Sequence, residues 1–168
     1  MTRLSFAELD CGVAQAAQQV GDKWTLVILR DVFNGINRYD DFALHLGVAS
    51  NVLAARLSAL VEADILYRRP VPGDGRAVEY KLTPKGFDLY PLIVFLQQWG
   101  DRWMPKPRGK RLEVVDRKTL RPVRAVQVHD ADGQPLTARD TRSRIGRGGS
   151  DVMQRLHAVV ARRHGGPT

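Results

Sequence analysis

The sequence predicts an α+β fold that is mainly helical, with one β-hairpin set within a series of helices. Apolar residues recur at helical spacing through most of residues 9–103. Two strand-like segments flank a turn rich in glycine and proline at residues 70–76. No apolar run approaches the roughly 20 residues that a membrane helix needs. The chain has 168 residues, enough for one domain and an appendage.

Two helices are expected at the start of the chain. Apolar residues at helical spacing run through residues 9–20, and a more strongly apolar segment occupies residues 23–33. Gly21 and Asp22 separate the two segments, so we expect two helices rather than one long helix.

A second pair of helices follows, joined by a short turn. We expect one helix over residues 39–46, closed by Gly47 as its C-cap. We expect the other over residues 51–63, with Ser50 as its N-cap. Two helices separated by a short turn that contains glycine are typical of the helix-turn-helix motif.

A β-hairpin is predicted directly after this motif. Residues 65–69 and 77–82 have the composition of strands, and residues 70–76 form a cluster of turn-forming residues between them. A hairpin in this position is called a wing. The predicted architecture is therefore a winged helix-turn-helix.

A long helix is expected after the wing, with Thr83 as its N-cap and Pro84 at its first position. It runs to about residue 103, where Pro105 and Pro107 end the pattern. We therefore expect a winged-helix domain over residues 1–104 and a basic C-terminal extension over residues 105–168.

The extension has fewer clear signals. Short strands are expected at residues 112–115 and 123–128, followed by a turn at residues 130–133. An Arg- and Gly-rich segment then leads to Ser150, which is expected to cap a terminal amphipathic helix. The turn at residues 130–133 lacks most ligand positions of a calcium loop, so an ordinary turn is the preferred interpretation.

The net charge of +8 is unevenly distributed along the chain. Residues 1–104 hold 11 Lys and Arg against 12 Asp and Glu, whereas residues 105–168 hold 15 against 6. A basic excess suits a polyanionic partner, but here the excess lies entirely in the extension. Long-range attraction to DNA is therefore expected from the extension rather than from the winged helix.

The inventory of reactive side chains argues against several classes of function. Cys11 is the one cysteine, so an intrachain disulfide and a cysteine-based zinc site are both excluded. The sequence shows neither a nucleophile–base pattern nor a phosphate-binding loop, and its four histidines are scattered. We expect a cytoplasmic protein that is not an enzyme and that needs no metal or cofactor.

Five short motifs stand in order along residues 11–103: CGVA at 11–14, GDKWTLVILR at 21–30, RY at 38–39, YKLTPKG at 80–86 and WGDRW at 99–103. Together they resemble the HxlR-type (MarR-like) winged helix-turn-helix regulators over about residues 10–104. The resemblance implies a homodimeric transcription factor of bacteria or archaea whose outer helices pair the subunits. It implies no catalytic activity.

The chain departs from the pattern of this family at a few positions. Gly12 stands where a proline is usual, and Asp22 stands where a glycine is usual. Some relatives carry a small zinc-ribbon-like extension with paired cysteines, but the comparable stretch around residues 116–133 has none. If this stretch descends from such a module, packing must hold it in place of a metal.

The second helix of the motif supplies most of the candidate DNA contacts. Its leucines point inward, so Asn51, Val52 and Ala55 are expected to face a major groove. Asn51 can bond to an adenine, and Val52 and Ala55 can touch a thymine methyl group. Ser50 and Arg56 can contact phosphate, although Arg56 can instead form a salt bridge to a nearby acid.

Four more candidates lie on the wing and at the start of the first helix of the motif. Arg69 and Arg76 flank the turn of the hairpin, where an arginine meets phosphate or the narrow minor groove. A solvated hairpin tip is the alternative for both. Arg38 and Tyr39 can meet the DNA backbone, and Tyr39 can equally pack inside the domain.

An apolar stripe on the helix after the wing predicts a subunit interface. The stripe is too apolar for one small domain, so we expect it to pair the subunits together with a residue of the first helix. The expected interface residues are Val13, Leu89, Ile93, Leu96, Trp99 and Trp103. The alternative is that the whole stripe covers its own domain.

Two features suggest a sensing function. In several family members a cysteine at the place of Cys11 senses oxidants or electrophiles, which makes Cys11 a candidate redox sensor. We favour the alternative, a small buried residue of the dimer helix, because no second cysteine is present to resolve an oxidised thiol. The helices around the dimer seam can also leave an apolar pocket for a small-molecule effector, lined by Trp24, Phe33 and Trp99.

Three functions compete at this point. The sequence favours a sequence-specific DNA-binding transcriptional regulator that acts as a homodimer, more readily as a repressor, on a double-stranded operator. A switch controlled by a small molecule or an oxidant, built on the same fold, is the second. A winged-helix protein-interaction module without sequence-specific DNA binding is the third, and the near-neutral charge of residues 1–104 is its best support.

Overall fold

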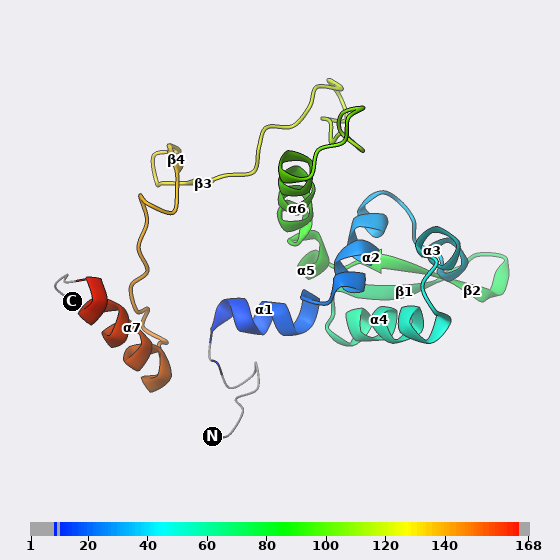
Figure 1. Ribbon diagram of the computed structural model, residues 1–168. Helices are drawn as coiled ribbons and strands as arrows, with labels where there is room; N and C mark the ends of the chain where they lie inside the picture. The colour runs from blue at the N-terminus through cyan, green and yellow to red at the C-terminus, as the bar shows by residue number, and fades with distance from the viewer. Residues whose placement is uncertain (1–8, 10, 165–168) are drawn as a thin grey trace. The chain divides into compact units, whose positions relative to one another are not determined.

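The computed structural model describes residue 9 and residues 11–164 (Figure 1). Its contacts divide the chain into two units. Residues 23–127 form the winged-helix unit, and residues 1–22 together with residues 128–168 form the terminal unit.

The described part of the terminal unit contains two helices and two very short strands: α1 (Gly12–Val20), β3 (Val128–His129), β4 (Pro135–Leu136) and α7 (Asp151–His164). Helix α1 is shorter than the expected helix over residues 9–20, and Cys11 is its N-cap. Strands β3 and β4 pair antiparallel around the turn that the sequence predicted at residues 130–133. The cap of α7 is as expected, since Ser150 Oγ accepts a hydrogen bond from the backbone N–H of Met153 at 3.4 Å.

Helix α2 (Lys23–Phe33) has the bounds that the sequence predicted. It contacts α4 (Ser50–Glu62), α6 (Tyr90–Trp103) and strand β2 (Asp74–Leu82), so it runs through the middle of the winged-helix unit (Figure 1). Ile28 and Leu29 are fully buried there.

The helix-turn-helix motif consists of α3 (Tyr39–Leu46) and α4. The bounds of α3 match the prediction, and Gly47 is its C-cap: its φ is +58° and its N–H donates to the Ala43 carbonyl at 3.1 Å. The prediction that Ser50 caps α4 was wrong. The carbonyl of Ala49 accepts hydrogen bonds from Val52 and Leu53, which makes Ala49 the N-cap and places Ser50 in the first helical turn.

The wing is an antiparallel hairpin of β1 (Leu66–Val71) and β2. Its turn is tighter than the expected segment 70–76, because β2 already begins at Asp74 and the register shifts between Pro70 and Val71. The base of the hairpin is tied to the start of α3. Tyr80 N–H donates to the Asn37 carbonyl at 2.7 Å, and Arg38 forms a backbone bridge with Glu79.

The long helix expected after the wing is two helices instead, α5 (Pro84–Phe87) and α6. The N-terminal prediction is confirmed, because Thr83 Oγ1 accepts a hydrogen bond from Gly86 N–H at 3.0 Å and Pro84 follows it. The prediction of continuity was wrong. Pro91 has no N–H to bond to the preceding turn, so a single helix through this point would lack that backbone hydrogen bond.

Thr83 is also bonded to the end of α4. Its hydroxyl donates to the Asp64 carbonyl at 2.7 Å, and Asp64 has a φ of +55°, in the left-handed region. Gly86 lies next to the Ile65 carbonyl oxygen so closely that a Cβ atom at position 86 would overlap it. Helix α5 therefore docks directly on the chain that leaves α4, and this docking requires glycine at position 86.

Residues 105–127 belong to the winged-helix unit and lie along α6. Gln97 Nε2 donates to the Leu112 carbonyl at 2.9 Å, and Gln98 bonds to both the Arg124 carbonyl and the Val126 N–H. Of the strands expected at 112–115 and 123–128, the structure has one bridge between Val115 and Pro122, and Val128 as the first residue of β3. Hydrogen bonds thus cross the domain boundary that the sequence analysis placed after Met104. The division of the chain at that boundary stays a prediction.

No helix within the described residues has both the length and the apolar composition to span a membrane.

We predict that Thr83→Ala lowers the free energy of unfolding by about 1–2 kcal/mol, because the N-cap hydrogen bond of α5 is lost and the Asp64 carbonyl loses its donor. Thr83→Ser keeps the hydroxyl and should retain most of the stability. Urea unfolding followed by circular dichroism measures both variants. Equal losses in the two variants would show that the methyl group, not the hydroxyl, is what matters.

Candidate DNA-binding surface

Helix α4 separates its side chains into a buried face and an exposed face. Leu53, Leu57 and Leu60 are buried in the core of the unit, as the sequence predicted. On the opposite side Asn51 and Ala55 are exposed. The helix therefore presents a continuous outer face beginning in its first turn.

The exposed face of α4 differs in detail from the expected one. Val52 is half-buried, whereas Ala54 is exposed, although the sequence argument did not select it. Helical periodicity could have found Ala54, because positions 51, 54, 55 and 58 share one face of a helix. Small side chains at these positions let the helix backbone approach a groove closely.

Polar groups at the start of α4 already have partners. Asn51 Oδ1 accepts a hydrogen bond from Val52 N–H at 2.9 Å. Tyr39 lies at the start of α3, is half-buried, and donates its hydroxyl proton to the Ser50 carbonyl at 3.0 Å. Tyr39 therefore joins the N-termini of the two helices of the motif.

The two arginines nearest this helix differ in accessibility. Arg38 is exposed beside the start of α3, where its backbone pairs with the wing. Arg56 is half-buried on α4. Arg38 is therefore the more accessible cation of the two for a phosphate.

The wing holds a cross-strand ion cluster. Arg69 Nη2 lies 2.7 Å from Glu79 Oε2, and Lys81 Nζ lies 3.1 Å from the same oxygen. The hydrogen bond from Arg69, followed by that from Lys81, lowers the pKa of Glu79 below its ordinary value, and the same contact raises the pKa of Arg69. Arg69 is thus already paired in the protein without DNA.

Arg68 is a candidate that the sequence argument missed. It is exposed on β1, its guanidinium lies 5.8 Å from the ring centre of Tyr80, and Nη2 lies 3.3 Å from Ser58 Oγ on α4. It bridges the wing and α4, so it lies between the two elements expected to contact DNA. The side chain of Arg76, also expected on the wing, lies outside the described part of the structure.

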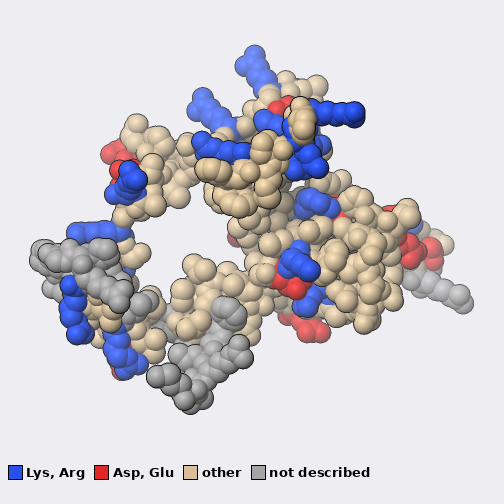
Figure 2. Space-filling view, in the orientation of Figure 1, with Lys and Arg blue, Asp and Glu red and all other residues tan. Residues whose placement is uncertain are grey.

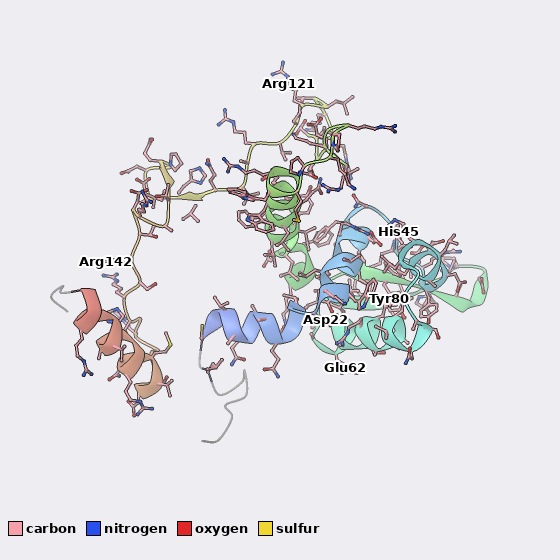
Figure 3. All side chains as sticks on the ribbon, in the orientation of Figure 1. Asp22, His45, Glu62, Tyr80, Arg121 and Arg142 are labelled. Carbon is pink, nitrogen blue, oxygen red and sulfur yellow. The ribbon has the colours of Figure 1, made fainter. Side chains whose placement is uncertain are left out.

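A basic segment follows α6, with eight Lys and Arg against two Asp and Glu over residues 105–127. Figure 2 shows these cations gathered on the surface of this segment, and Figure 3 shows Arg121 at its outer end. Asp116 fixes the turn there by accepting hydrogen bonds from the N–H groups of Lys118 and Thr119. These bonds, that from Thr119 first, hold the pKa of Asp116 below its ordinary value.

The apolar stripe on α6 is only partly covered. Ile93 is buried within its own unit and Leu89 is half-buried, while Leu96, Trp99 and Trp103 are exposed. Val13, from the terminal unit, is also exposed. Phe95 is a further exposed apolar residue of α6 that the sequence argument did not include.

The sensing features expected from the sequence belong to different units of the chain. Cys11 is half-buried at the N-cap of α1, in the terminal unit. Phe33 and Trp99 line different cavities of the winged-helix unit, and a pocket shared by Trp24, Phe33 and Trp99 at a dimer seam stays a prediction. Within the described residues, no group of three or more His, Cys, Asp or Glu side chains is placed to hold a metal ion.

Comparison with known proteins identifies relatives of the whole winged-helix region. The family model of the HxlR-like helix-turn-helix matches residues 19–108. Rv3095 of Mycobacterium tuberculosis, named as an uncharacterised HTH-type transcriptional regulator, is 41% identical over 102 residues. That match spans 61% of this chain and 65% of the relative's length.

Two solved structures extend the comparison. The crystal structure of PA1607, a candidate transcription factor, has a TM-score of 0.77 at 40% identity and covers 86% of this chain and 99% of its own. The oxidised form of the redox regulator HypR has a TM-score of 0.51 at 25% identity, covering 55% of this chain and 96% of its own. The resemblance and the winged helix-turn-helix fold that the sequence predicted are therefore confirmed.

We predict that the Glu79 carboxyl titrates below the ordinary range of a glutamate and that Arg69→Gln returns its pKa toward that range. Because Arg69 favours the charged carboxylate, any stability from this pair is present above the ordinary pKa and is lost as the pH falls through the lowered one. An NMR titration of the Glu79 side-chain carbon measures both midpoints. Arg68→Gln is the matched control, since Arg68 bonds to Ser58 instead. Equal midpoints in wild type and Arg69→Gln would contradict the assignment.

Proposed function

The chain belongs to the HxlR-like helix-turn-helix family of transcriptional regulators, and we propose that it binds a specific double-stranded DNA operator as a homodimer and acts as a repressor. The exposed outer face of α4, set beside the wing, is the observation that carries this proposal. Its action in the cytoplasm stays a prediction.

Helix α4 would read bases mainly through shape and short side chains. Asn51 is the one outward side chain in its first turns with both donor and acceptor groups suited to adenine. Reaching a base requires Asn51 to give up its bond to Val52 N–H, which is a local and inexpensive change. Ala54 and Ala55 fit against a thymine methyl group without holding the helix away from the groove.

Anchoring to the DNA backbone would come from the arginines around α4. Arg38 is exposed at the start of α3, and Arg68 bridges the wing and α4. A phosphate approaching Arg69 competes with Glu79 for the same guanidinium, so Glu79 weakens attachment to DNA of any sequence. The basic segment 105–127 would add long-range attraction that the nearly neutral residues 1–104 do not supply.

The exposed apolar residues of α6 support the homodimer. Leu96, Phe95, Trp99 and Trp103 leave apolar surface uncovered along a single helix. Exposed apolar surface of this kind marks an interaction site in a protein of ordinary solubility. A second copy of the chain is the proposed occupant, because regulators on two-fold symmetric operators place one recognition helix in each half-site.

Two alternatives remain from the sequence. A protein-interaction module would bind duplex DNA weakly and without preference, whereas the proposed regulator prefers one sequence strongly.

The second alternative is a switch controlled by an oxidant. Cys11 lies at the N-cap of α1, beside the N–H groups of a helix terminus, which is compatible with a reactive thiol. Both roles proposed for Cys11, sensor and packing residue, stay predictions.

We predict that Asn51→Ala weakens binding to the operator by roughly tenfold to a hundredfold, corresponding to about 1–3 kcal/mol for one adenine contact, and leaves binding to unrelated DNA unchanged. Fluorescence anisotropy with the DNA upstream of the protein's own gene measures both. Ala59→Ser, on the later turns of α4, is the matched control. Unchanged operator affinity in Asn51→Ala would overturn the residue assignment, and equal affinity of the wild type for all sequences would favour the interaction module.

We predict that Trp103→Glu converts the dimer to a monomer, because a carboxylate would have to be desolvated inside the apolar interface. Light scattering coupled to gel filtration should give twice the chain mass of 18.8 kDa for the wild type and once that mass for the variant. Phe87→Glu is the control, since Phe87 is 60% exposed and Trp103 is 66% exposed, but Phe87 lies on α5 outside the stripe. A monomeric wild type would remove the homodimer from the proposal.

A further inference from the structure

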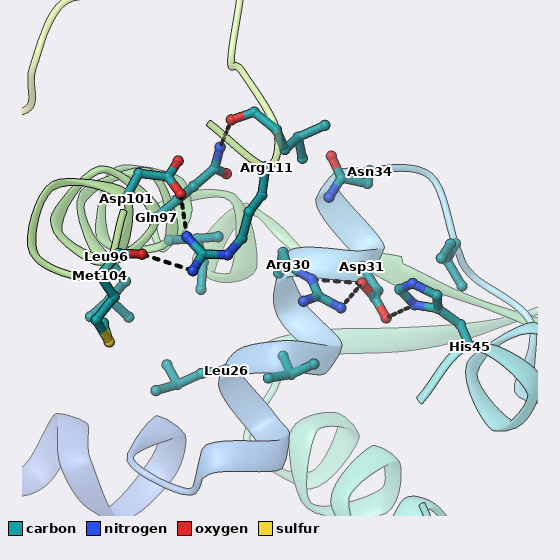
Figure 4. A pocket seen from close by; sticks show the side chains of 15 residues that line it. Leu26, Arg30, Asp31, Asn34, His45, Leu96, Gln97, Asp101, Met104 and Arg111 are labelled. Carbon is teal, nitrogen blue, oxygen red and sulfur yellow. Dashed lines mark hydrogen bonds and ion pairs between the residues drawn. The ribbon is translucent and has the colours of Figure 1, made fainter. Parts of the chain in front are cut away.

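A cavity of about 700 Å³ lies within the winged-helix unit, between α2, α3 and α6 (Figure 4). Its volume falls within the range of about 300–1,000 Å³ that is usual for small-molecule sites. Most of its wall is apolar, contributed by Leu26, Val27, Ile93, Leu96, Met104 and Leu112. An apolar body of small-molecule size therefore has both room and contact surface here.

A buried carboxylate bonded to an arginine and a histidine forms the α2 side of the cavity. Arg30 Nε and Nη2 lie 2.8 and 2.7 Å from Asp31 Oδ1, and His45 Nδ1 lies 2.8 Å from Oδ2 (Figure 4). Asp31 is 1% exposed and His45 comes from α3. The cluster thus joins the cavity to the first helix of the DNA-binding motif.

A second ion pair forms the α6 side. Arg111 Nη1 lies 2.9 Å from Asp101 Oδ1, and Arg111 Nη2 donates to the Met104 carbonyl at 2.8 Å. This contact ties the basic segment to α6 at the edge of the cavity.

The accessible guanidinium groups of these clusters are hydrogen-bond donors. The side chains of Arg30, His45 and Arg111 are between 40% and 51% exposed. The carboxylates of Asp31 and Asp101 are 1% and 12% exposed and already accept hydrogen bonds. A molecule entering the cavity therefore meets guanidinium N–H groups around an apolar wall, which suits an anionic acceptor.

We propose that this cavity binds a small organic carboxylate with an apolar body. The apolar body packs between α2 and α6, and the carboxylate accepts hydrogen bonds from Arg30, His45 or Arg111. The proposal deepens the proposed function and rests on it for its regulatory meaning. A ligand that takes donors from Asp31 changes the contact between α2 and α3, so its binding alters the affinity for DNA.

Gly100 offers a direct way to close the cavity. It lies on α6 in the cavity wall, and a Cβ atom there would meet only the terminal methyl group of Met104, at an ordinary contact distance of 3.8 Å. Gly100→Leu places a side chain into the cavity without removing a native contact, and leucine favours the helix more than glycine does. Gly100→Ala is the matched control, because one methyl group leaves most of the volume open.

The experiment is isothermal titration calorimetry on the full chain with benzoate, 1-naphthoate and octanoate and with their neutral amides. We expect at least one carboxylate to bind roughly tenfold or more tightly than its amide, as a charge-assisted hydrogen bond requires. Gly100→Leu should abolish that binding, and Gly100→Ala should keep it. Leu26→Trp, which fills the cavity from α2, should also abolish it and covers the case in which Gly100→Leu fails to fold.

Operator affinity measured with and without the bound carboxylate completes the test. A change in affinity in the wild type and in Gly100→Ala, absent in Gly100→Leu, is the expected result. No binding of any carboxylate overturns the inference, as does equal binding of acid and amide or unchanged binding in both filled variants. If a second copy of the chain fills the cavity instead, no carboxylate binds and Gly100→Leu lowers the mass in light scattering.

The experiments distinguish a failure of the ligand site from a failure of the proposed DNA-binding function. Operator binding without carboxylate binding leaves the regulator standing and removes the ligand site. Carboxylate binding without any preference for an operator keeps the site and removes the regulator.

Discussion

The winged-helix unit depends on one junction, where the end of α4, the end of the wing and the start of α5 meet at Thr83. The Thr83 hydroxyl donates to the partly buried Asp64 carbonyl and accepts from the buried Gly86 N–H, so a single side chain satisfies two backbone groups. Buried backbone groups left without partners are costly, which makes this arrangement hard to replace. Because α4 carries the proposed reading face and the hairpin carries the wing arginines, the junction sets the geometry between the two elements proposed to face DNA.

The exposed face of α4 and the basic segment 105–127 differ in charge, which suggests different contributions to DNA binding. The outer face of α4 has small side chains and no exposed cation in its first turns, and the wing neutralises Arg69 with Glu79. Such a surface depends on close fit, which is a short-range property and discriminates between sequences. The basic segment 105–127 has the opposite character, since a net charge of +6 attracts any polyanion over a Debye length of roughly 10 Å. If α4 reads the operator as proposed, the charge of the basic segment can change without altering the side chains of the reading helix.

Much of the fold followed from the sequence because local signals agreed with tertiary packing. The bounds of α2 and α3, the Gly47 cap and the Thr83 cap all rest on local chemistry. The errors came where two local signals competed or where distant contacts decided. Ser50 has the side chain that favours an N-cap, but hydrogen bonds from Val52 and Leu53 to the Ala49 carbonyl begin α4 one residue earlier. The cavity could not be predicted, because Asp31 and His45 meet only after α2 and α3 pack, and the pairing of Arg69 with Glu79 depends on the hairpin register.

The position of Asp31 gives the cavity its proposed connection to DNA binding. A surface ion pair contributes little to stability, so a ligand that broke one would hardly change the relative stability of the protein's conformations. Asp31 is buried, and removing one partner of a buried ion pair typically costs about 3–5 kcal/mol because the other charge is left uncompensated; half-exposed partners such as Arg30 and His45 reduce that figure. A carboxylate that draws away His45 or Arg30 therefore forces Asp31 to find another donor or α3 to shift. Since α3 is tied to α4 by Tyr39 and to the wing through Asn37 and Tyr80, such a shift is transmitted to the surface proposed to meet DNA.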